Sequence, residues 1–239
     1  MKLSIVAGLL TCLLTTTTAS ASVYDPLIDT AAKRHGVDRI VLRAIAQQES
    51  GKNPWSFNAD GEGFKFQSRE NAITALYAIN SAPWMVKVLP HRGDGAVHRR
   101  FFRDSASAQQ YLNGYLAVHG LNGKRVITQR TDAKKDLDFG QARVRRLWLL
   151  NTDIGIGQIS YRFHGQNRVS VQHWFNPAIN LDYAASLIAE HKRSTGSDLE
   201  AAGLYHSKTP SLRAAYMKRF MPIYRKEVAR AQQSLTASH

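Results

Sequence analysis

The feature that most constrains the fold is a helix-forming segment that ends on an acidic residue. From Asp38 to Glu49, apolar side chains recur at positions 41, 42, 45 and 46, which is the spacing of one stripe of an α-helix. Asp38 is suited to the N-cap of this helix. Glu49 lies three and four residues beyond Ile45 and Ala46, so it continues the apolar stripe. The segment therefore predicts a core helix whose last turn carries a partly desolvated carboxylate.

Two interpretations of Glu49 follow from this position. Desolvation disfavours the charged form of a carboxyl group and raises its pKa, which is what a general acid needs near neutral pH. The alternative, which this segment favours when it is taken alone, is an ordinary last-turn glutamate beside a glycine C-cap at Gly51. The rest of the chain shifts the balance toward the acid.

Four short motifs occur along the chain in the order that one glycosidase family shows. They are the segments Glu49–Pro54, Asn151–Ile159, Asn176–Leu187 and Ala201–Ser207. Together they resemble the motifs of the soluble lytic transglycosylases, the goose-type-lysozyme-like glycosidases. The run Tyr205–Pro210 is similar to the ending found in the subgroup that accompanies secretion, conjugation or pilus machines. The resemblance covers roughly residues 25–60 and 150–230 and leaves the middle of the chain unexplained.

This resemblance implies a mainly α fold, a lysozyme-like α+β glycosidase domain that cleaves the β-1,4 bond between N-acetylmuramic acid and N-acetylglucosamine. Most glycosidases use two carboxyl groups. In the family that this chain resembles, one carboxyl suffices. It protonates the leaving oxygen, the N-acetyl carbonyl stabilises the cation, and the same carboxyl then takes a proton from the sugar's own 6-hydroxyl. The resemblance assigns this role to Glu49 and implies a 1,6-anhydro product, no cofactor and no metal.

Five further residues are expected to bind the substrate. By analogy Ser50 would hydrogen-bond the sugar, although it could merely cap the turn after the helix. Gly155 would let the backbone approach the sugar closely. The amide of Gln158 suits an N-acetyl group, and the phenol of Tyr205 can reach both a carboxyl and a sugar. Asn180 is expected to position the neighbouring loop or, alternatively, to act as a helix N-cap.

Asp153 is a candidate second carboxylate. It lies two residues before Gly155, in a loop that should face the catalytic carboxyl across the cleft. As a second carboxylate it would aid an activated water or the cation, which would make the protein a hydrolytic muramidase. The favoured alternative is an Asx-turn, in which Asp153 only hydrogen-bonds the backbone of the loop.

Residues 1–21 read as a secretory signal. Lys2 gives the positive start, Leu3–Leu14 the apolar region, and Ala19–Ala21 an A-x-A cleavage site. This apolar region is too short to span a membrane. Cys12, the only cysteine, follows Thr11 where a lipoprotein signal would have a small residue. These features predict a periplasmic protein without stable membrane insertion, whose residues 22–239 form one domain, with a basic lobe inserted at about 61–150.

Charge is the second global feature. The net charge is +14, and residues 61–152 hold 15 Lys/Arg against 7 Asp/Glu. The dense spots His98–Arg100 and Arg143–Arg146 are predicted to be solvated faces; the alternative is a basic wall of the groove or a docking face. The expected partners are peptidoglycan strands with free carboxylates and, by resemblance, components of an envelope-spanning machine. We expect a monomer.

Two other classes of function stay open at this stage. One is a non-catalytic peptidoglycan-binding or docking module of the same fold, against which the intact set of site residues argues. The other is a basic periplasmic nucleic-acid-binding protein. Nucleic-acid binding is not expected, because the aromatic residues follow core periods and do not lie between the basic residues.

Local signals also predict the order of the elements. The expected helices cover 25–35, 38–49, 68–79, 104–118, 180–192, 198–205 and 210–234. The expected strands cover 63–66, 124–130 and 142–150, and a loop is expected over 53–58.

Overall fold

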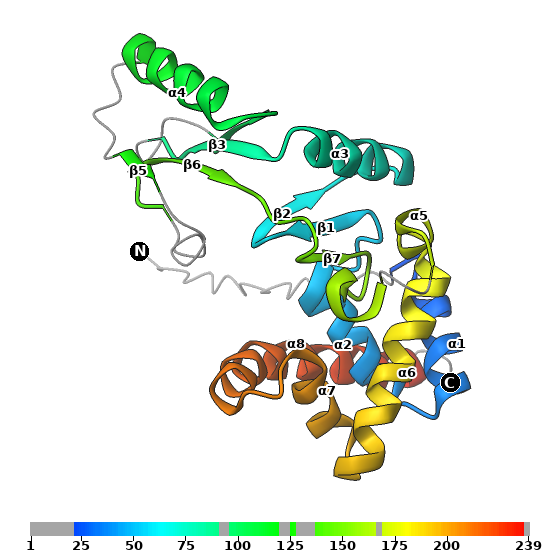
Figure 1. Cartoon of the computed structure of the whole chain (residues 1–239). Coiled ribbons are helices and arrows are strands. Elements are labelled where there is room, and N and C mark those ends of the chain that lie inside the picture. The colour runs from blue at the N-terminus through cyan, green and yellow to red at the C-terminus, as the bar shows by residue number, and fades with distance from the viewer. Residues whose placement is uncertain (1–21, 91–95, 120–124, 128–136, 166–168, 237–239) are drawn as a thin grey trace, which may run out of the picture.

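The computed structural model describes residues 22–90, 96–119, 125–127, 137–165 and 169–236. These residues form a mainly α protein with two small sheets (Figure 1). The predicted signal, with Cys12, lies outside the described residues, as do the two ends of the strand predicted at 124–130. Within the described ranges, no helix combines the length and hydrophobicity that crossing a membrane requires.

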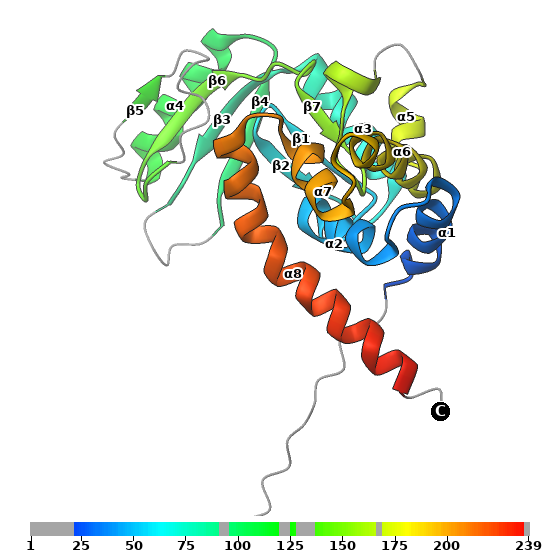
Figure 2. The same cartoon turned by 90° about the horizontal axis from the view of Figure 1, so that it is seen from below.

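The main body is a set of packed helices around one core. Its helices are α1 (Asp25–His35), α2 (Arg39–Ser50), α3 (Arg69–Ser81), α5 (Val171–Trp174), α6 (Pro177–Thr195), α7 (Asp198–His206) and α8 (Pro210–Thr236). α6 packs on α1 and α7, and α8 packs on α2 and α7 (Figure 2). Ile28, Leu42 and Phe220 are fully buried, so α1, α2 and α8 contribute to the same core.

A first sheet lies against these helices. Its strand order is β2-β1-β7-β8, with β1 (Ser56–Ala59), β2 (Glu62–Lys65), β7 (Thr152–Ile154) and β8 (Ile159–Ser160), and every pairing is antiparallel. In this register Asp153 lies opposite Asn58 on one side and Ser160 on the other. The buried ring of Phe57 packs on Phe175, which joins this sheet to the helices.

The second sheet and α4 form a unit with its own core. The sheet has the order β4-β3-β6-β5, with β3 (Trp84–Val88), β4 (His98–Phe102), β5 (Arg125–Ile127) and β6 (Ala142–Arg146). α4 (Ser105–His119) covers this sheet and buries Leu112 against Val86 and Val144. This unit therefore starts near Trp84, later than the predicted lobe boundary at 61, because α3 buries its apolar face in the main core.

Ion pairs join the two sheets, and the burial of Arg143 and Arg145 corrects in part the prediction that the basic spots are solvated. Arg145 on β6 is 2% exposed and pairs with Asp60 at 2.8 Å and with Glu62 at 3.4 Å. Lys87 and Arg99 approach the same Glu62 carboxylate at 2.9 and 3.3 Å. Arg145 lies inside the protein, and Lys87 and Arg99 are half-buried, because the turn between β1 and β2 brings two acids to meet them. Arg143 is also buried. Arg100 and Arg146 are exposed, as predicted.

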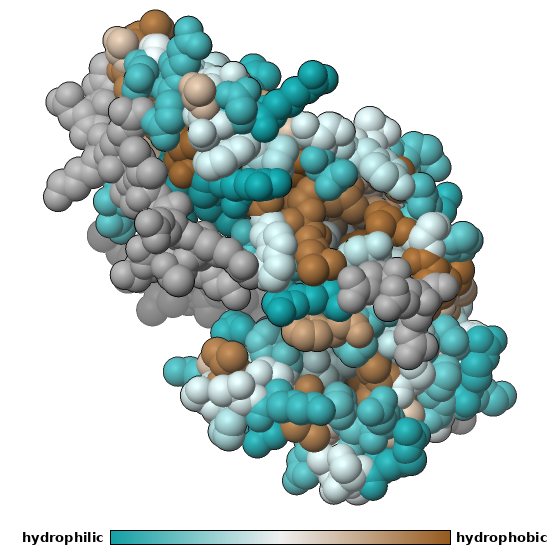
Figure 3. Space-filling model, in the orientation of Figure 1, coloured by the Kyte–Doolittle hydropathy of each residue, from teal (hydrophilic) through white to brown (hydrophobic). Residues whose placement is uncertain are grey.

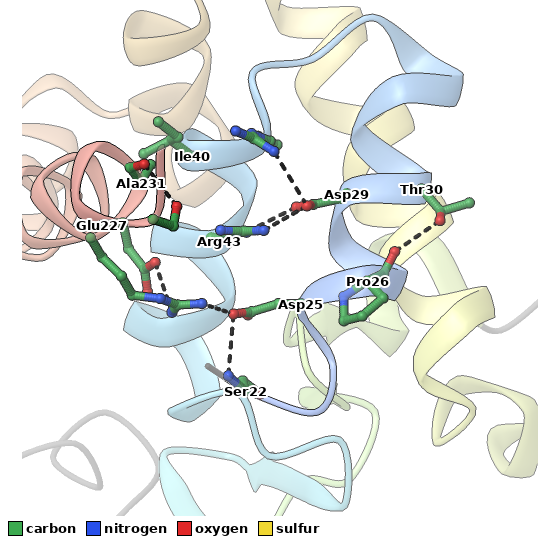
Figure 4. Close-up of polar contacts among 12 residues, drawn as sticks. Ser22, Asp25, Pro26, Asp29, Thr30, Ile40, Arg43, Glu227 and Ala231 are labelled. Carbon is green, nitrogen blue, oxygen red and sulfur yellow. Dashed lines mark hydrogen bonds and ion pairs between the residues drawn. The ribbon is translucent and has the colours of Figure 1, made fainter. Parts of the chain in front are cut away.

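A second buried ion cluster ties α8 to α1 and to the turn after α2. Lys52 pairs with Asp25 at 2.9 Å and with Glu227 at 2.8 Å, and Arg230 pairs with both acids. Figure 4 shows Asp25 and Glu227 close to a neighbouring ion pair between Asp29 and Arg43. The long last helix is thus held near its C-terminal end.

Several predicted elements are confirmed and others need correction. The helices expected at 25–35 and 38–49, and those opening at Ser68 and near 104, are confirmed. The loop expected at 53–58 is wrong in part, because Ser56 begins β1. α6 starts earlier than expected and is capped by Asn176, and Ser197 caps α7 where Asp198 was expected to do so. β3 and β4 have no counterpart among the predicted elements.

An apolar patch lies on the surface between α3 and β7 (Figure 3). Beneath it is a pocket of ≈270 Å³ lined by Leu76, Tyr77, Asn80, Leu149, Leu150, Thr152, Ile154, Tyr161 and Val171. Thr152 and Ile154 alternate with Asp153 along β7, so the patch and the acidic side chain occupy opposite faces of that strand.

Candidate active site

Glu49 is held at the site because α2 is anchored at both ends. The Asp38 side chain accepts a hydrogen bond from the Ile40 amide at 2.7 Å and caps the first turn. Gly51 ends the helix in the left-handed conformation, with φ +68°. Between these ends the apolar stripe packs into the core, and half-buried Glu49 lines a surface groove.

The groove is assembled from elements that are distant in the sequence. Its volume is ≈760 Å³. Its lining residues are Glu49, Asn58, Asn151, Asp153, Gln158, Ile159, Ser160, Phe163, His164, Leu187, Glu190, His191, Leu204, Tyr205, His206, Ser207 and Lys208. The structure therefore brings together Glu49, Asp153, Gln158 and Tyr205, four of the residues that the sequence singles out.

The Glu49 carboxyl is set up to hold a proton. Its Oε1 atom is buried without a hydrogen-bond partner among the described residues. Burial is the main cause that raises the pKa of Glu49 to about 7, and the negative charge of Asp153 raises it further. The Tyr216 hydroxyl and the Arg219 charge act in the opposite direction. A carboxyl with this pKa is protonated in a large fraction of molecules at neutral pH.

The turn after Glu49 contains a residue in a strained backbone conformation, and buried ion pairs hold that residue in place. Lys52 has φ +59°, a left-handed conformation that is costly for a residue with a side chain. Its ammonium is buried between Asp25 and Glu227. These ion pairs keep Lys52 in place and so fix the direction in which the chain leaves the helix that carries Glu49.

Asn180 organises the loop that faces Glu49. Its side chain is fully buried, and its Nδ2 donates to the carbonyls of Ile154 at 2.8 Å and Trp174 at 2.9 Å. Its Oδ1 accepts from the Gly157 amide at 2.8 Å. Asn180 therefore positions the loop, as the sequence predicts, but it does not line the groove, which corrects its place among the residues expected to bind the substrate. It is not the N-cap of α6 either.

Gly155 and Ser50 also act inside the protein. Gly155 has φ +82°, and a Cβ there would lie 2.4 Å from Nδ2 of Asn180. The Asn180 side chain therefore leaves no room for a side chain at Gly155. The prediction was that a bound sugar would need this space. The buried Ser50 hydroxyl lies 2.8 Å from the Ile156 carbonyl and 3.1 Å from that of Ala46. It ties the end of α2 to the loop and is not exposed to the groove.

Gln158 and Tyr205 line the groove and also hold the loop. Gln158 has φ +51°, and its Nε2 donates to the Gly155 carbonyl at 2.8 Å. The Tyr205 hydroxyl donates to the Gly157 carbonyl at 2.5 Å. Burial and the nearby charges of Glu49 and Asp153 raise the pKa of Tyr205 well above its ordinary value, so its phenol stays protonated.

Asp153 is placed in the groove by the register of β7. Its side chain lines the same groove as Glu49, and the two carboxyls interact strongly enough for the Asp153 charge to raise the pKa of Glu49. This geometry is compatible with a charge that stabilises a nearby cation and with a base that activates water.

Two residues on α8 complete the surroundings of Glu49, and sequence reasoning does not find them. Tyr216 is 1% exposed, its ring stacks on that of His206 at 4.4 Å, and its hydroxyl lies beside Glu49 without a hydrogen bond of normal geometry. Burial and the Glu49 charge raise the pKa of Tyr216. Arg219 is exposed one turn away. The only signal in the sequence is a tyrosine on a core stripe, where its hydroxyl needs a partner.

The described residues include no cluster of three or more His, Cys, Asp or Glu that could hold a metal ion. A scan of protein-family models, a search of curated proteins and a search of solved structures each found no match to this chain. The motifs of the sequence and the chemistry of the groove are therefore the features that indicate a function.

Proposed function

We propose that this chain is a peptidoglycan lytic transglycosylase with a lysozyme-like α+β domain, which cleaves the β-1,4 bond between N-acetylmuramic acid and N-acetylglucosamine. The observation that carries the proposal is the Glu49 carboxyl, which combines a pKa of about 7 with an unpartnered oxygen in a groove of ≈760 Å³. All four sequence motifs contribute side chains to the lining of that groove, the third through Leu187, and Asn180 of that third motif holds the loop.

Glu49 performs two proton transfers in this mechanism. Protonated Glu49 gives its proton to the glycosidic oxygen as the bond to the muramic carbon breaks, and the N-acetyl carbonyl stabilises the cation that forms. The resulting carboxylate takes a proton from the 6-hydroxyl of the same sugar, whose oxygen bonds to the cationic carbon. Glu49 regains its proton, no water is consumed, and the product ends in 1,6-anhydromuramic acid. The steps use no metal and no cofactor.

A second candidate is a hydrolytic muramidase, which the position of Asp153 favours. In two-carboxylate glycosidases the second carboxyl activates water or attacks the sugar. Asp153 shares the groove with Glu49 and raises its pKa. The transglycosylase is preferred because attack by the sugar's own hydroxyl is intramolecular and has a high effective molarity compared with water.

A digest of purified murein sacculi, with the products identified by mass, tests the proposal. The released muropeptides should end mainly in 1,6-anhydromuramic acid, and Asp153→Asn should lower the rate only modestly. Reducing-end products, together with an Asp153→Asn variant as inactive as Glu49→Gln, would establish the hydrolase. No cleavage by the wild type, with sacculus binding retained, would leave a non-catalytic binding module.

The cellular setting follows from the sequence. The signal at 1–21 supports export to the periplasm. There the enzyme would open the wall locally for an envelope-spanning secretion, conjugation or pilus apparatus, as the similarity of Tyr205–Pro210 to that subgroup indicates. The net charge of +14 supports attraction to a wall that carries free carboxylates.

A further inference from the structure

A large aromatic ring is exposed in the groove that Glu49 lines. Phe163 is 72% exposed and lines the groove, and it belongs to the π-helix η2 (Tyr161–Gly165). π-Helical turns are often found at functional sites. A large aromatic ring that stays in water inside a concave site is typical of a ligand contact.

The ring of Phe163 is supported from behind. The Arg162 guanidinium lies 5.3 Å from the centre of the Phe163 ring and 5.0 Å from that of Trp148, so one cation links two aromatic rings. The next residue, His164, contacts the Tyr183 hydroxyl at 3.3 Å. Buried Gly165, at the end of η2, packs closely on the ring of Tyr161, the first residue of η2. A Cβ at position 165 would lie 2.6 Å from that ring. The exposed ring is therefore presented by a supported turn.

Polar side chains complete the surroundings of the ring. His164 lines the groove beside Phe163, and α6 contributes Leu187, Glu190 and His191 to the same lining. An apolar face with hydrogen-bonding groups at its rim matches a pyranose, which presents C–H groups on one face and hydroxyls around its edge. Partially positive C–H groups are attracted to the negative face of an aromatic ring.

We propose that Phe163 is the stacking platform of a sugar-binding subsite for an N-acetylated pyranose of the glycan strand. This subsite deepens the proposed function and rests on it, because it is part of the groove that holds Glu49. Glu190 and His191 bind the hydroxyls of the stacked sugar. Arg162 and Trp148 are positioning residues that keep the ring of Phe163 facing the groove.

The charges in the groove favour a sugar over a nucleobase. Glu49, Asp153 and Glu190 all line it, whereas Lys208 is the sole Lys or Arg among the described lining residues. The carboxylates of Asp153 and Glu190 would repel the phosphates that accompany a base, and single-stranded nucleic-acid sites combine their aromatics with a positive groove. A neutral glycan carries no such penalty.

The test uses the β-1,4-linked tetramer of N-acetylglucosamine as the probe and the Glu49→Gln protein, which does not turn it over. Binding is measured by calorimetry. Adding Phe163→Ala should weaken binding by about five- to tenfold, the worth of one aromatic contact. Phe163→Tyr should bind within about twofold of the parent. The matched control is Phe139→Ala, since Phe139 is 52% exposed but does not line the groove.

The outcomes separate this inference from the proposed function. Unchanged affinity in Phe163→Ala, or equal losses in Phe163→Ala and Phe139→Ala, would overturn the subsite. No binding of the tetramer by the Glu49→Gln protein would overturn it as well. Tetramer binding that depends on Phe163, in a protein whose wild type releases no anhydro product from sacculi, would support the subsite and reject the transglycosylase.

Discussion

At the scale of single residues, the position of Glu49 on the buried stripe of α2 determines the pKa of its carboxyl group. The stripe that buries Ile45 carries the carboxyl to the edge of the core, where burial raises its pKa. Tyr216 on α8 lies beside it with a protonated phenol, which can donate to the carboxylate once the proton has left. Burial thus disfavours ionisation of the Glu49 carboxyl, and the Tyr216 hydroxyl stabilises the carboxylate once it has formed.

Glu49→Gln should abolish the release of muropeptides and leave binding to sacculi within about twofold, because the amide keeps the shape but delivers no proton. Initial rates and a sacculus pelleting assay measure the two effects. Activity above about a tenth of wild type would contradict the assignment.

In the wild type, turnover should fall as the pH rises past about 7, where Glu49 loses its proton.

The same variant has a second consequence, for stability. The folded-state pKa of Glu49 is about 7, whereas an unfolded glutamate titrates near about 4.3. The folded state therefore binds the proton more tightly, and the wild type loses stability as the pH rises between these values. Glu49→Gln should match the wild type near pH 4 and exceed it at pH 8 by about 1–3 kcal/mol. Urea unfolding at both pH values measures this, and an equal difference at both would argue against a raised pKa.

At the scale of elements, the loop between β7 and β8 depends on one side chain of α6. Asn180→Ala would leave the Gly157 amide and the Ile154 carbonyl without their partners, at a cost of about 2–4 kcal/mol. Activity should fall as well, because the Gly157 carbonyl holds the Tyr205 hydroxyl. Thermal unfolding and sacculus digestion follow the two effects.

A second asparagine on the same helix provides the control. Asn176 caps α6 by accepting a hydrogen bond from the Ala178 amide at 2.9 Å. Asn176→Ala should cost about 1 kcal/mol of stability and leave activity close to wild type. If both variants lose activity equally, the effect comes from α6 as a whole and not from the loop.

The elements also show which parts of the structure local signals can predict. Asp38 and Gly51 define α2 because caps act within a few residues, and the stripe between them identifies Glu49 as unusual. The burial of Arg145 could not be found in this way, since its partner Asp60 is 85 residues away in the chain. For Asn180 the sequence predicts that it positions the neighbouring loop but not which groups it binds, because one partner is the Ile154 carbonyl of β7, 26 residues away. Sequence spacing therefore predicts the possible roles of a residue, and its tertiary contacts determine which role it has in the folded protein.

At the scale of the whole molecule, the cluster around Lys52 couples α8 to the site. Burial alone would raise the pKa of Asp25, but the hydrogen bonds and charges of Arg230 and Lys52 lower it below its ordinary value. Asp25→Asn should therefore cost about 3–5 kcal/mol at pH 7, because it leaves Lys52 and Arg230 with Glu227 as their single shared partner and one positive charge uncompensated.

The pH dependence of that loss has a defined sign. The folded-state pKa of Asp25 is depressed, so its contribution to stability is present above the unfolded pKa of about 3.9 and is lost as the pH falls through the folded value. Urea unfolding of wild type and Asp25→Asn should converge below about pH 4. Asp182→Asn is the control, since Asp182 pairs with the exposed Arg34 and should cost at most about 1 kcal/mol. A difference that persists undiminished in acid would reject the charge mechanism.

The distribution of charge over the molecule also changes where the wall is expected to bind. With Arg145 buried among acids, it cannot attract a distant polyanion, although it belongs to a basic run in the sequence. α8 carries six Lys/Arg against one Glu. Lys218, Arg225 and Lys226 are exposed and are spaced seven and eight residues apart, so they share its outer face. The helix begins next to the groove, because Lys208 lines the groove two residues before the helix starts.

Replacing Lys218, Arg225 and Lys226 together with Gln should therefore weaken binding to sacculi, most strongly at low ionic strength. The difference should shrink toward about 0.15 M salt, where attraction beyond roughly 8 Å is screened. Pelleting assays in a Glu49→Gln background measure binding without digestion. The control replaces Lys33, Arg103 and Arg193, which are exposed at scattered sites, and lowers the net charge by the same amount. Because a local face acts more strongly than scattered charges on a polymer at its surface, the α8 variant should lose more affinity. Equal losses would assign the attraction to net charge alone, and no loss in either variant would remove electrostatics from wall binding.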